Sequence, residues 1–198
     1  MRLVSKIVKI LILLGFLQSC SNIQMINTAN IYSGEFLRKI DSVQLIYRDG
    51  DKKGALTKLN AIDDNLLSKA ELAKKYNLKG VMLYSLKSVD QAIESFLLAE
   101  QNVGEDLYLA SNIKLNLASS FYRIDKVEVA YSYIKKNDAN YLKGKELSSF
   151  YKLWFNLAVQ LSKPKEITIA LLNLTKDVTR FKDLEVYKYK EILVDNFK

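Results

Sequence analysis

The sequence predicts an all-α protein, built as an α-α superhelix of about four helix pairs with a capping helix at its C-terminal end. Only seven Gly and one Pro occur among the 198 residues, and the apolar residues are rich in Leu, Ile and Ala. This composition favours helices joined by short connections. Alanine also recurs at nearly constant spacing, at Ala55, Ala92, Ala130 and Ala170. Such spacing is typical of an array in which every helix pair repeats the same close contact.

The first 19 residues are typical of a secretory signal peptide. A basic start is followed by an apolar run from Ile7 to Leu17 that only Lys9 and Gly15 interrupt. A permanent membrane-spanning helix needs about 20 apolar residues, so an uncleaved anchor is disfavoured.

The leader ends in Leu17-Gln18-Ser19-Cys20, which resembles the lipobox of bacterial lipoproteins. The resemblance implies cleavage before Cys20, acylation of this cysteine and a lipid anchor in the bacterial cell envelope. Two or three acyl chains hold a protein stably at a membrane. Residues 20–33 are then expected to form a flexible tether. The alternative is a buried cysteine that stands here by chance. In some double-membrane bacteria an Asp after the cysteine retains lipoproteins in the inner membrane, so Ser21 indicates the outer one.

The clearest copy of the repeat runs from Tyr76 to Ala99. It reads YNLKGVMLYSLKSVDQAIESFLLA and resembles a tetratricopeptide repeat. The equivalent alanines of the four copies lie 37, 38 and 40 residues apart, against a usual period of about 34. Inserted residues are expected around Asn65, Asp106 and Lys143, where they lengthen either the helices or the turns between repeats.

The repeat domain is expected to cover residues 34–198. Pro164 fits a helix start, where its missing N–H loses no hydrogen bond. The last segment spaces apolar residues among charges, as expected of a cap with a polar outer face. The predicted helices span 34–48, 51–64, 68–87, 89–102, 105–123, 126–137, 145–162, 164–177 and 180–195.

The resemblance assigns a set of residues to the contact between the two helices of a pair. Small residues allow the helices to approach, and larger apolar residues fill the space beside the contact. This packing set comprises Tyr76, Gly80, Ala92, Phe96, Ala118, Ala130, Trp154, Ala158 and Ala170.

The resemblance also implies a peptide-binding groove along the first helices of the pairs. Three copies place Tyr at equivalent positions, and three place a cation beside it; Tyr and Arg are enriched at interface hot spots. We expect a groove suited to a segment that carries acidic groups. The alternative is that these tyrosines only pack under the next turn. The predicted groove residues are Tyr47, Arg48, Asn77, Tyr84, Asn112, Tyr122, Arg123 and Lys163.

Two absences limit the chemistry of the chain. It contains no His and a single Cys, which excludes His-based catalytic triads, His-ligated metals and disulfides within the chain. No metal, cofactor or nucleic acid is expected, because no ligand spacing is present and the net charge of +8 is scattered among acids. The adjacent acids Asp63 and Asp64 are interpreted as a solvated pair at a helix end.

These patterns predict a non-catalytic adaptor that binds another envelope protein or peptide. Assembly of outer-membrane proteins is one setting in which such lipoproteins act, by analogy of fold alone. The alternative is a surface-exposed binder of a host molecule or a cell-wall polymer. An enzyme is the third class, and no converging set of polar residues supports it.

Overall fold

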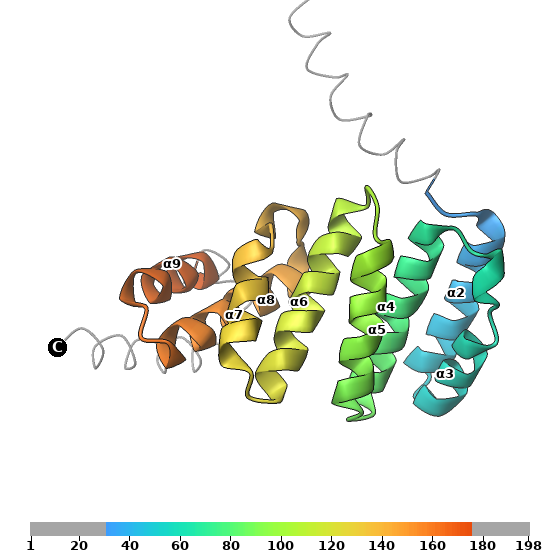
Figure 1. Cartoon of the computed structure of the whole chain (residues 1–198), viewed down its shortest axis with the longest axis horizontal. Helices are drawn as coiled ribbons and strands as arrows, with labels where there is room; N and C mark the ends of the chain where they lie inside the picture. The colour runs from blue at the N-terminus through green and yellow to red at the C-terminus, as the bar shows by residue number, and fades with distance from the viewer. Residues whose placement is uncertain (1–30, 176–198) are drawn as a thin grey trace, which may run out of the picture.

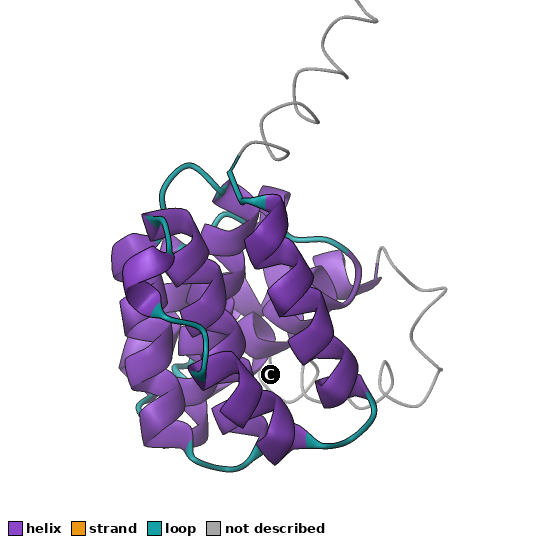
Figure 2. Ribbon diagram, turned by 90° about the vertical axis from the view of Figure 1, so that its right-hand side faces the viewer, coloured by secondary structure: helices purple, strands orange, loops and turns teal. Residues whose placement is uncertain are grey.

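The computed structural model describes residues 31–175, which form helices and connections without a strand (Figures 1 and 2). The predicted signal peptide, Cys20 and the predicted helix at 180–195 lie outside the described residues. Two short 3₁₀ turns, η1 and η2, interrupt the connections between α-helices. The elements are α2 (Gly34–Arg48), α3 (Lys52–Asn60), η1 (Asp64–Leu66), α4 (Lys69–Ser85), α5 (Val89–Asn102), α6 (Leu107–Arg123), α7 (Val127–Lys136), η2 (Ala139–Tyr141), α8 (Gly144–Gln160) and α9 (Pro164–Thr175).

Consecutive helices pack as four antiparallel pairs, α2 with α3, α4 with α5, α6 with α7 and α8 with α9 (Figure 1). Each pair also packs against the next one along the chain. The described part of the chain therefore confirms the predicted all-α array of helix pairs. None of its helices is both long and apolar enough to cross a membrane.

The turn inside every pair has the same length and backbone shape. Three residues join the two helices in each case, and the middle residue has a positive φ: 98° at Gly50, 67° at Lys87, 59° at Asp125 and 51° at Ser162. A residue in the left-handed conformation after a helix allows the following N–H groups to donate hydrogen bonds to the last carbonyls of the helix. At Lys87, for example, the N–H donates to the carbonyl of Tyr84. The pairs are thus true structural repeats.

We expect Lys87→Gly to raise the free energy of unfolding by about 0.5–1 kcal/mol. A side chain at positive φ costs roughly 1–2 kcal/mol, and the greater freedom of Gly in the unfolded chain offsets part of that gain. Lys87 is exposed, so removal of its side chain loses few packing contacts. Urea denaturation followed by circular dichroism measures the change.

The matched control is Gly50→Ala, at the equivalent turn. A Cβ there meets nothing within 4 Å, so only backbone strain acts, and a loss of about 1 kcal/mol is expected. Equal stabilities for both variants and the parent would contradict the left-handed geometry of these turns.

The repeated alanines occupy the matching positions that the sequence predicted for them. Ala55, Ala92, Ala130 and Ala170 are all fully buried, each on the second helix of its pair. Gly80 faces Phe96 so closely that an added Cβ would lie 2.5 Å from the ring. Small side chains therefore let the paired helices approach, as the close-packing argument requires.

The rest of the packing set is also inside the array. Ala118, Ala158 and Phe96 are buried, while Tyr76 and Trp154 are partly buried against the same clusters. The apolar interior continues from pair to pair, because α6 contributes residues both to the cluster with α4 and α5 and to the cluster with α7 and α8.

Long connections lie at 61–68 and 137–143, around Asn65 and Lys143, as expected. The connection at 103–106 is short, so the longer period around Asp106 comes from the lengths of α5 and α6. The predicted helix 51–64 is too long, however, because α3 ends at Asn60. Asp63 accepts a hydrogen bond from the N–H of Asn65 and begins η1 instead. A short acidic side chain that binds the local backbone competes in this way with helix continuation.

The interpretation of Asp63 and Asp64 as a solvated pair is wrong for Asp64. Its carboxylate accepts hydrogen bonds from the buried Lys75 ammonium and from the Tyr76 hydroxyl. Lys75 also donates to the carbonyl of Ile62, at 2.5 Å. The Asp64 carboxylate thus neutralises the buried Lys75 ammonium. The residues next to Asp64 in the sequence do not indicate this contact.

Candidate functional site

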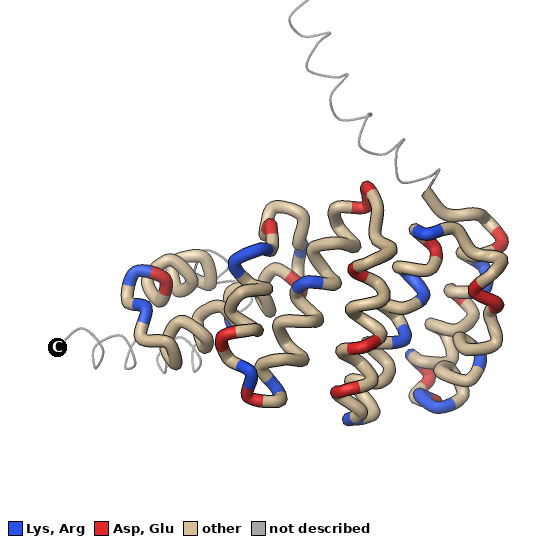
Figure 3. Tube along the Cα trace, in the orientation of Figure 1, with Lys and Arg blue, Asp and Glu red and all other residues tan. Residues whose placement is uncertain are grey.

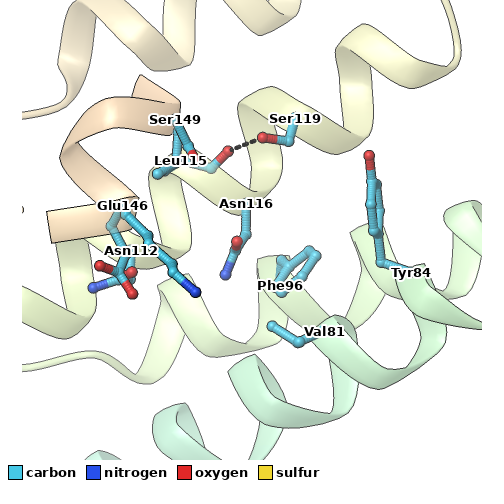
Figure 4. Close-up of a pocket in the computed structure, with 10 residues that line it drawn as sticks. Val81, Tyr84, Phe96, Asn112, Leu115, Asn116, Ser119, Glu146 and Ser149 are labelled. Atoms are coloured by element: carbon cyan, nitrogen blue, oxygen red, sulfur yellow. Dashed lines mark hydrogen bonds between the residues drawn. The ribbon is translucent and has the colours of Figure 1, made fainter. Parts of the chain in front are cut away.

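A hollow with a volume of about 300 Å³ lies across the first helices of the second, third and fourth pairs (Figure 4). Both apolar and polar side chains line it. The lining residues are Val81 and Tyr84 of α4, Phe96 of α5, Asn112, Leu115, Asn116 and Ser119 of α6, and Lys145, Glu146 and Ser149 of α8.

Helical periodicity explains why these side chains share a face. Asn112, Asn116 and Ser119 lie four and three residues apart on α6, which places them in one row along the helix. Val81 and Tyr84 are likewise three apart on α4. The packing of α4 and α8 on either side of α6 brings the three faces together. The hollow thus depends on the stacking of pairs rather than on any single pair.

Two amides on α6 contribute hydrogen-bonding groups to the lining of the hollow. Asn116 donates through Nδ2 to Oδ1 of Asn77 at 2.9 Å. Asn112 donates to the carbonyl of Tyr108, at 3.0 Å, on its own helix. An asparagine amide has two donor hydrogens and an acceptor oxygen, so each retains capacity for a ligand. This capacity matches a peptide backbone, which also offers donors and acceptors.

Tyr84 and Arg123 join two pairs at the edge of this hollow. The Cζ of Arg123, at the end of α6, lies 4.9 Å from the centre of the Tyr84 ring on α4. A guanidinium at this distance over an aromatic face is attracted by the ring quadrupole. The contact holds the ring at the rim and leaves one of its edges to the hollow.

The predicted groove residues divide into two groups. Tyr84 and Asn112 line the hollow, Asn77 bonds to the lining Asn116, and Arg123 lies over Tyr84. The other four lie elsewhere. Tyr47 and Tyr122 pack against core clusters, Arg48 is exposed at the end of α2, and the Lys163 ammonium lies 5.0 Å from the ring centre of Tyr131 on α7.

Several lining residues were missed by sequence reasoning. The polar row of Asn112, Asn116 and Ser119 at helical spacing could have indicated one face of α6. Lys145, Glu146 and Ser149 could not have been found, because they reach the hollow only through the packing of α8 beside α6. The hollow contains one cation and one anion, so its charge does not favour an acidic segment.

A second polar cluster surrounds Glu166 of α9. Its carboxylate accepts hydrogen bonds from Tyr131 Oη at 2.5 Å, Trp154 Nε1 at 2.6 Å and Lys135 Nζ at 3.3 Å. Burial opposes ionisation, but these hydrogen bonds and the charge of Lys135 outweigh it and hold the pKa of Glu166 below its ordinary value. Burial and the bond to Glu166 raise the pKa of Tyr131 to about 12.

This Glu166 cluster connects α7, α8 and α9, and none of its residues lines the hollow described above. Three donors already converge on its carboxylate, and the Glu166 side chain is only 19% exposed. Such a group stabilises the last pair and has little capacity left for a substrate. Within the described residues, no group of His, Cys, Asp and Glu side chains could hold a metal ion.

These observations define the class of the molecule as an all-α array of helix pairs with a hollow across its first helices. Comparison with known proteins adds no family: no protein-family model matches the chain, and no curated protein matches it.

Proposed function

We propose that this chain is a membrane-anchored, non-catalytic scaffold of the bacterial cell envelope. In this proposal a lipid on Cys20 tethers the protein, at the outer membrane rather than the inner one, and the hollow binds an extended segment of a partner protein. The resemblance of residues 17–20 to a lipobox and of the helix pairs to tetratricopeptide repeats supports it. An adaptor in the assembly of outer-membrane proteins is one such role.

The observation that carries the proposal is the hollow between α4, α6 and α8. An extended peptide could cross all three helices, because the lining residues come from consecutive pairs. Ligand sites usually combine an apolar floor with a few placed polar groups, and Phe96 with Asn112 and Asn116 has that composition. The engaged donors around Glu166 and the absence of His support a binding role over catalysis.

The first experiment places a photo-crosslinking amino acid at position 112 of the full-length protein in its native envelope. We expect one crosslinked protein band, whose identity mass spectrometry gives. The same amino acid at position 94 is the control, because Glu94 is exposed on α5 and does not line the hollow. Equal crosslinking at both positions would contradict the proposed site.

We expect Asn112→Ala to weaken binding of the captured partner roughly five- to tenfold. Loss of one hydrogen bond costs about 1 kcal/mol, which corresponds to this factor. The melting temperature should stay close to that of the parent, because the amide bonds only to its own helix. Calorimetric titration with the purified partner measures the affinity.

Two tyrosine variants separate groove from packing. Tyr84→Ala should lower both affinity and melting temperature, whereas Tyr122→Ala should lower only the melting temperature, because Tyr122 packs against a core cluster and does not itself line the hollow. Unchanged affinity in Tyr84→Ala and Asn112→Ala would overturn the assignment of the hollow. Protease treatment of intact cells then distinguishes a periplasmic adaptor from a surface-exposed binder.

A further inference from the structure

Tyr32 and Ser33, which precede α2, form hydrogen bonds at one edge of the array. The Tyr32 hydroxyl donates to Asp106 at 2.6 Å, and the N–H of Ser33 donates to Glu71 at 2.8 Å. Asp106 precedes α6, and Glu71 lies in the first turn of α4. The incoming chain is therefore fixed to the starts of the second and third pairs.

The connection between α7 and α8 lies at the same edge. Ser111, near the start of α6, donates to the carbonyl of Asp138 at 3.2 Å, and Asn137 donates to the carbonyl of Ser111 at 2.9 Å. We call the region formed by residues 32–33, 61–68, 103–108 and 137–143 the connection edge. Figure 1 shows the incoming chain and the α5–α6 and α7–α8 connections at the upper side of the array.

Two turns of the connection edge share one sequence and one shape. Asp63-Asp64-Asn65-Leu66-Leu67 and Asp138-Ala139-Asn140-Tyr141-Leu142 both read Asp-x-Asn-apolar-Leu. In each, the Asp side chain accepts from the N–H two residues later, and a 3₁₀ turn follows. The fourth residue of each turn projects outward, since Leu66 is 76% exposed and Tyr141 is 36% exposed.

The first turn of α6, beside the α5–α6 connection, exposes apolar groups as well. Leu107 is 49% exposed and Tyr108 is 47% exposed. At the opposite edge, the turns at 49–51, 86–88, 124–126 and 161–163 contain none of the large exposed apolar side chains of the described residues. Leu45, in the last turn of α2, and Val129, in the first turn of α7, are the exposed apolar side chains beside those turns. The connection edge therefore exposes more large apolar side chains than the opposite edge does.

We infer that the connection edge rests on the lipid bilayer, with Leu66, Leu107, Tyr108 and Tyr141 in the interface between headgroups and acyl chains. The inference rests on the proposed lipid anchor at Cys20. Tyr and Leu side chains suit this interface, where an apolar body meets a wet surface.

The position of the anchor identifies the bilayer as the occupant. Tyr32 lies twelve residues after Cys20, so the acylated cysteine is at most about 40 Å from this edge even with the chain fully extended. The opposite edge is farther by the length of a 17-residue helix such as α6, which is about 26 Å. The connection edge is thus the side that the anchor brings to the membrane.

Apolar contact, rather than net charge, holds this edge to the bilayer. Basic and acidic residues are intermixed along the array (Figure 3). The connection edge itself carries more acids than bases, namely Asp63, Asp64, Glu105, Asp106 and Asp138 against Lys143. Three acids of the edge, Asp63, Asp106 and Asp138, already accept hydrogen bonds from backbone N–H groups. Contact with phosphatidylcholine vesicles should therefore need no anionic lipid and change little with salt.

The test uses the full acylated protein in phosphatidylcholine vesicles. Cys20 is the only cysteine, and acylation removes its thiol, so Leu66→Cys and Tyr108→Cys each provide one site for an environment-sensitive fluorophore. Glu128→Cys, at the exposed start of α7 near the opposite edge, is the matched control. We expect spin-labelled lipid to quench the probes at 66 and 108 roughly five-fold more than the probe at 128.

Each outcome has one meaning. Equal quenching at the three positions, or stronger quenching at 128, overturns the inference while the anchor stands. A blue-shifted probe at 66 that lipid does not quench indicates contact with a second protein copy, and also overturns it. A thiol probe that labels the unsubstituted protein at Cys20 shows that the anchor itself is absent, and the proposed function then fails together with the inference.

A double variant tests the shared turn directly. Leu66→Ser combined with Tyr141→Ser should reduce lipid quenching of the probe at 108 at least two-fold, because two of the four inserted side chains are lost. The melting temperature should change little, since both side chains are exposed. Unchanged quenching would show that these turns do not contact the bilayer.

Discussion

Phe96→Ala is expected to lower the free energy of unfolding by about 3–5 kcal/mol. Phe96 is only 1% exposed and lies at the centre of the cluster that joins α4, α5 and α6. Truncation removes apolar contact and leaves a cavity that the neighbouring helices cannot close. Urea denaturation of the full chain, followed by circular dichroism, measures the loss.

The control for this truncation is Leu98→Ala on the same helix. Leu98 is exposed, so its loss should change stability by about 0.5 kcal/mol or less. A similar small change at Phe96 would mean that the second pair does not pack as described.

Gly80 provides an independent check on the same contact. Alanine normally stabilises a helix interior by up to about 1 kcal/mol relative to glycine. Here its Cβ would lie 2.5 Å from Cε1 and 2.6 Å from Cδ1 of Phe96, so we expect Gly80→Ala to destabilise by about 1–3 kcal/mol instead. In a Phe96→Leu background, Gly80→Ala should cost less stability, because two residues in direct contact have non-additive effects. Additive effects would contradict the contact.

The second large effect is expected at Glu166. Glu166→Ala removes the acceptor shared by Tyr131, Trp154 and Lys135. Two partly buried donors then lack their partner, and we expect a loss of about 2–3 kcal/mol at neutral pH. Trp154 is the only tryptophan of the chain, so its fluorescence reports directly on this cluster during unfolding.

The pH dependence of this loss follows from the lowered pKa of Glu166. The ionised carboxylate is favoured by the fold, so its contribution is fully present above the ordinary value near 4.5 and disappears as the pH falls through the lowered value. The difference in stability between the parent and Glu166→Gln should therefore be largest near neutrality and shrink below pH 4.5. A difference that grows in acid would contradict the ionised state.

A small part of the candidate site was within reach of the sequence, but not its assembly. Groove positions carried over from the tetratricopeptide resemblance led to Tyr84 and Asn112, both of which line the hollow. The same argument assigned Tyr122 and Lys163 to the groove, although Tyr122 packs against the interior and Lys163 lies over Tyr131. Residues at the same position of different repeats can have different neighbours, because the adjacent helix pairs differ in sequence and in the length of their connections.

By itself, the sequence determined the helices, their pairing and the small residues at the paired contacts. These are local properties, since periodicity, turn residues and side-chain size act within about forty residues. Only the tertiary structure decided that Asn77 meets Asn116, that Lys145 and Glu146 complete the hollow and that Tyr32 docks on Asp106. These contacts depend on the angle and register at which one pair stacks on the next. Many side chains and connections of unequal length set that stacking jointly, so no short segment encodes it.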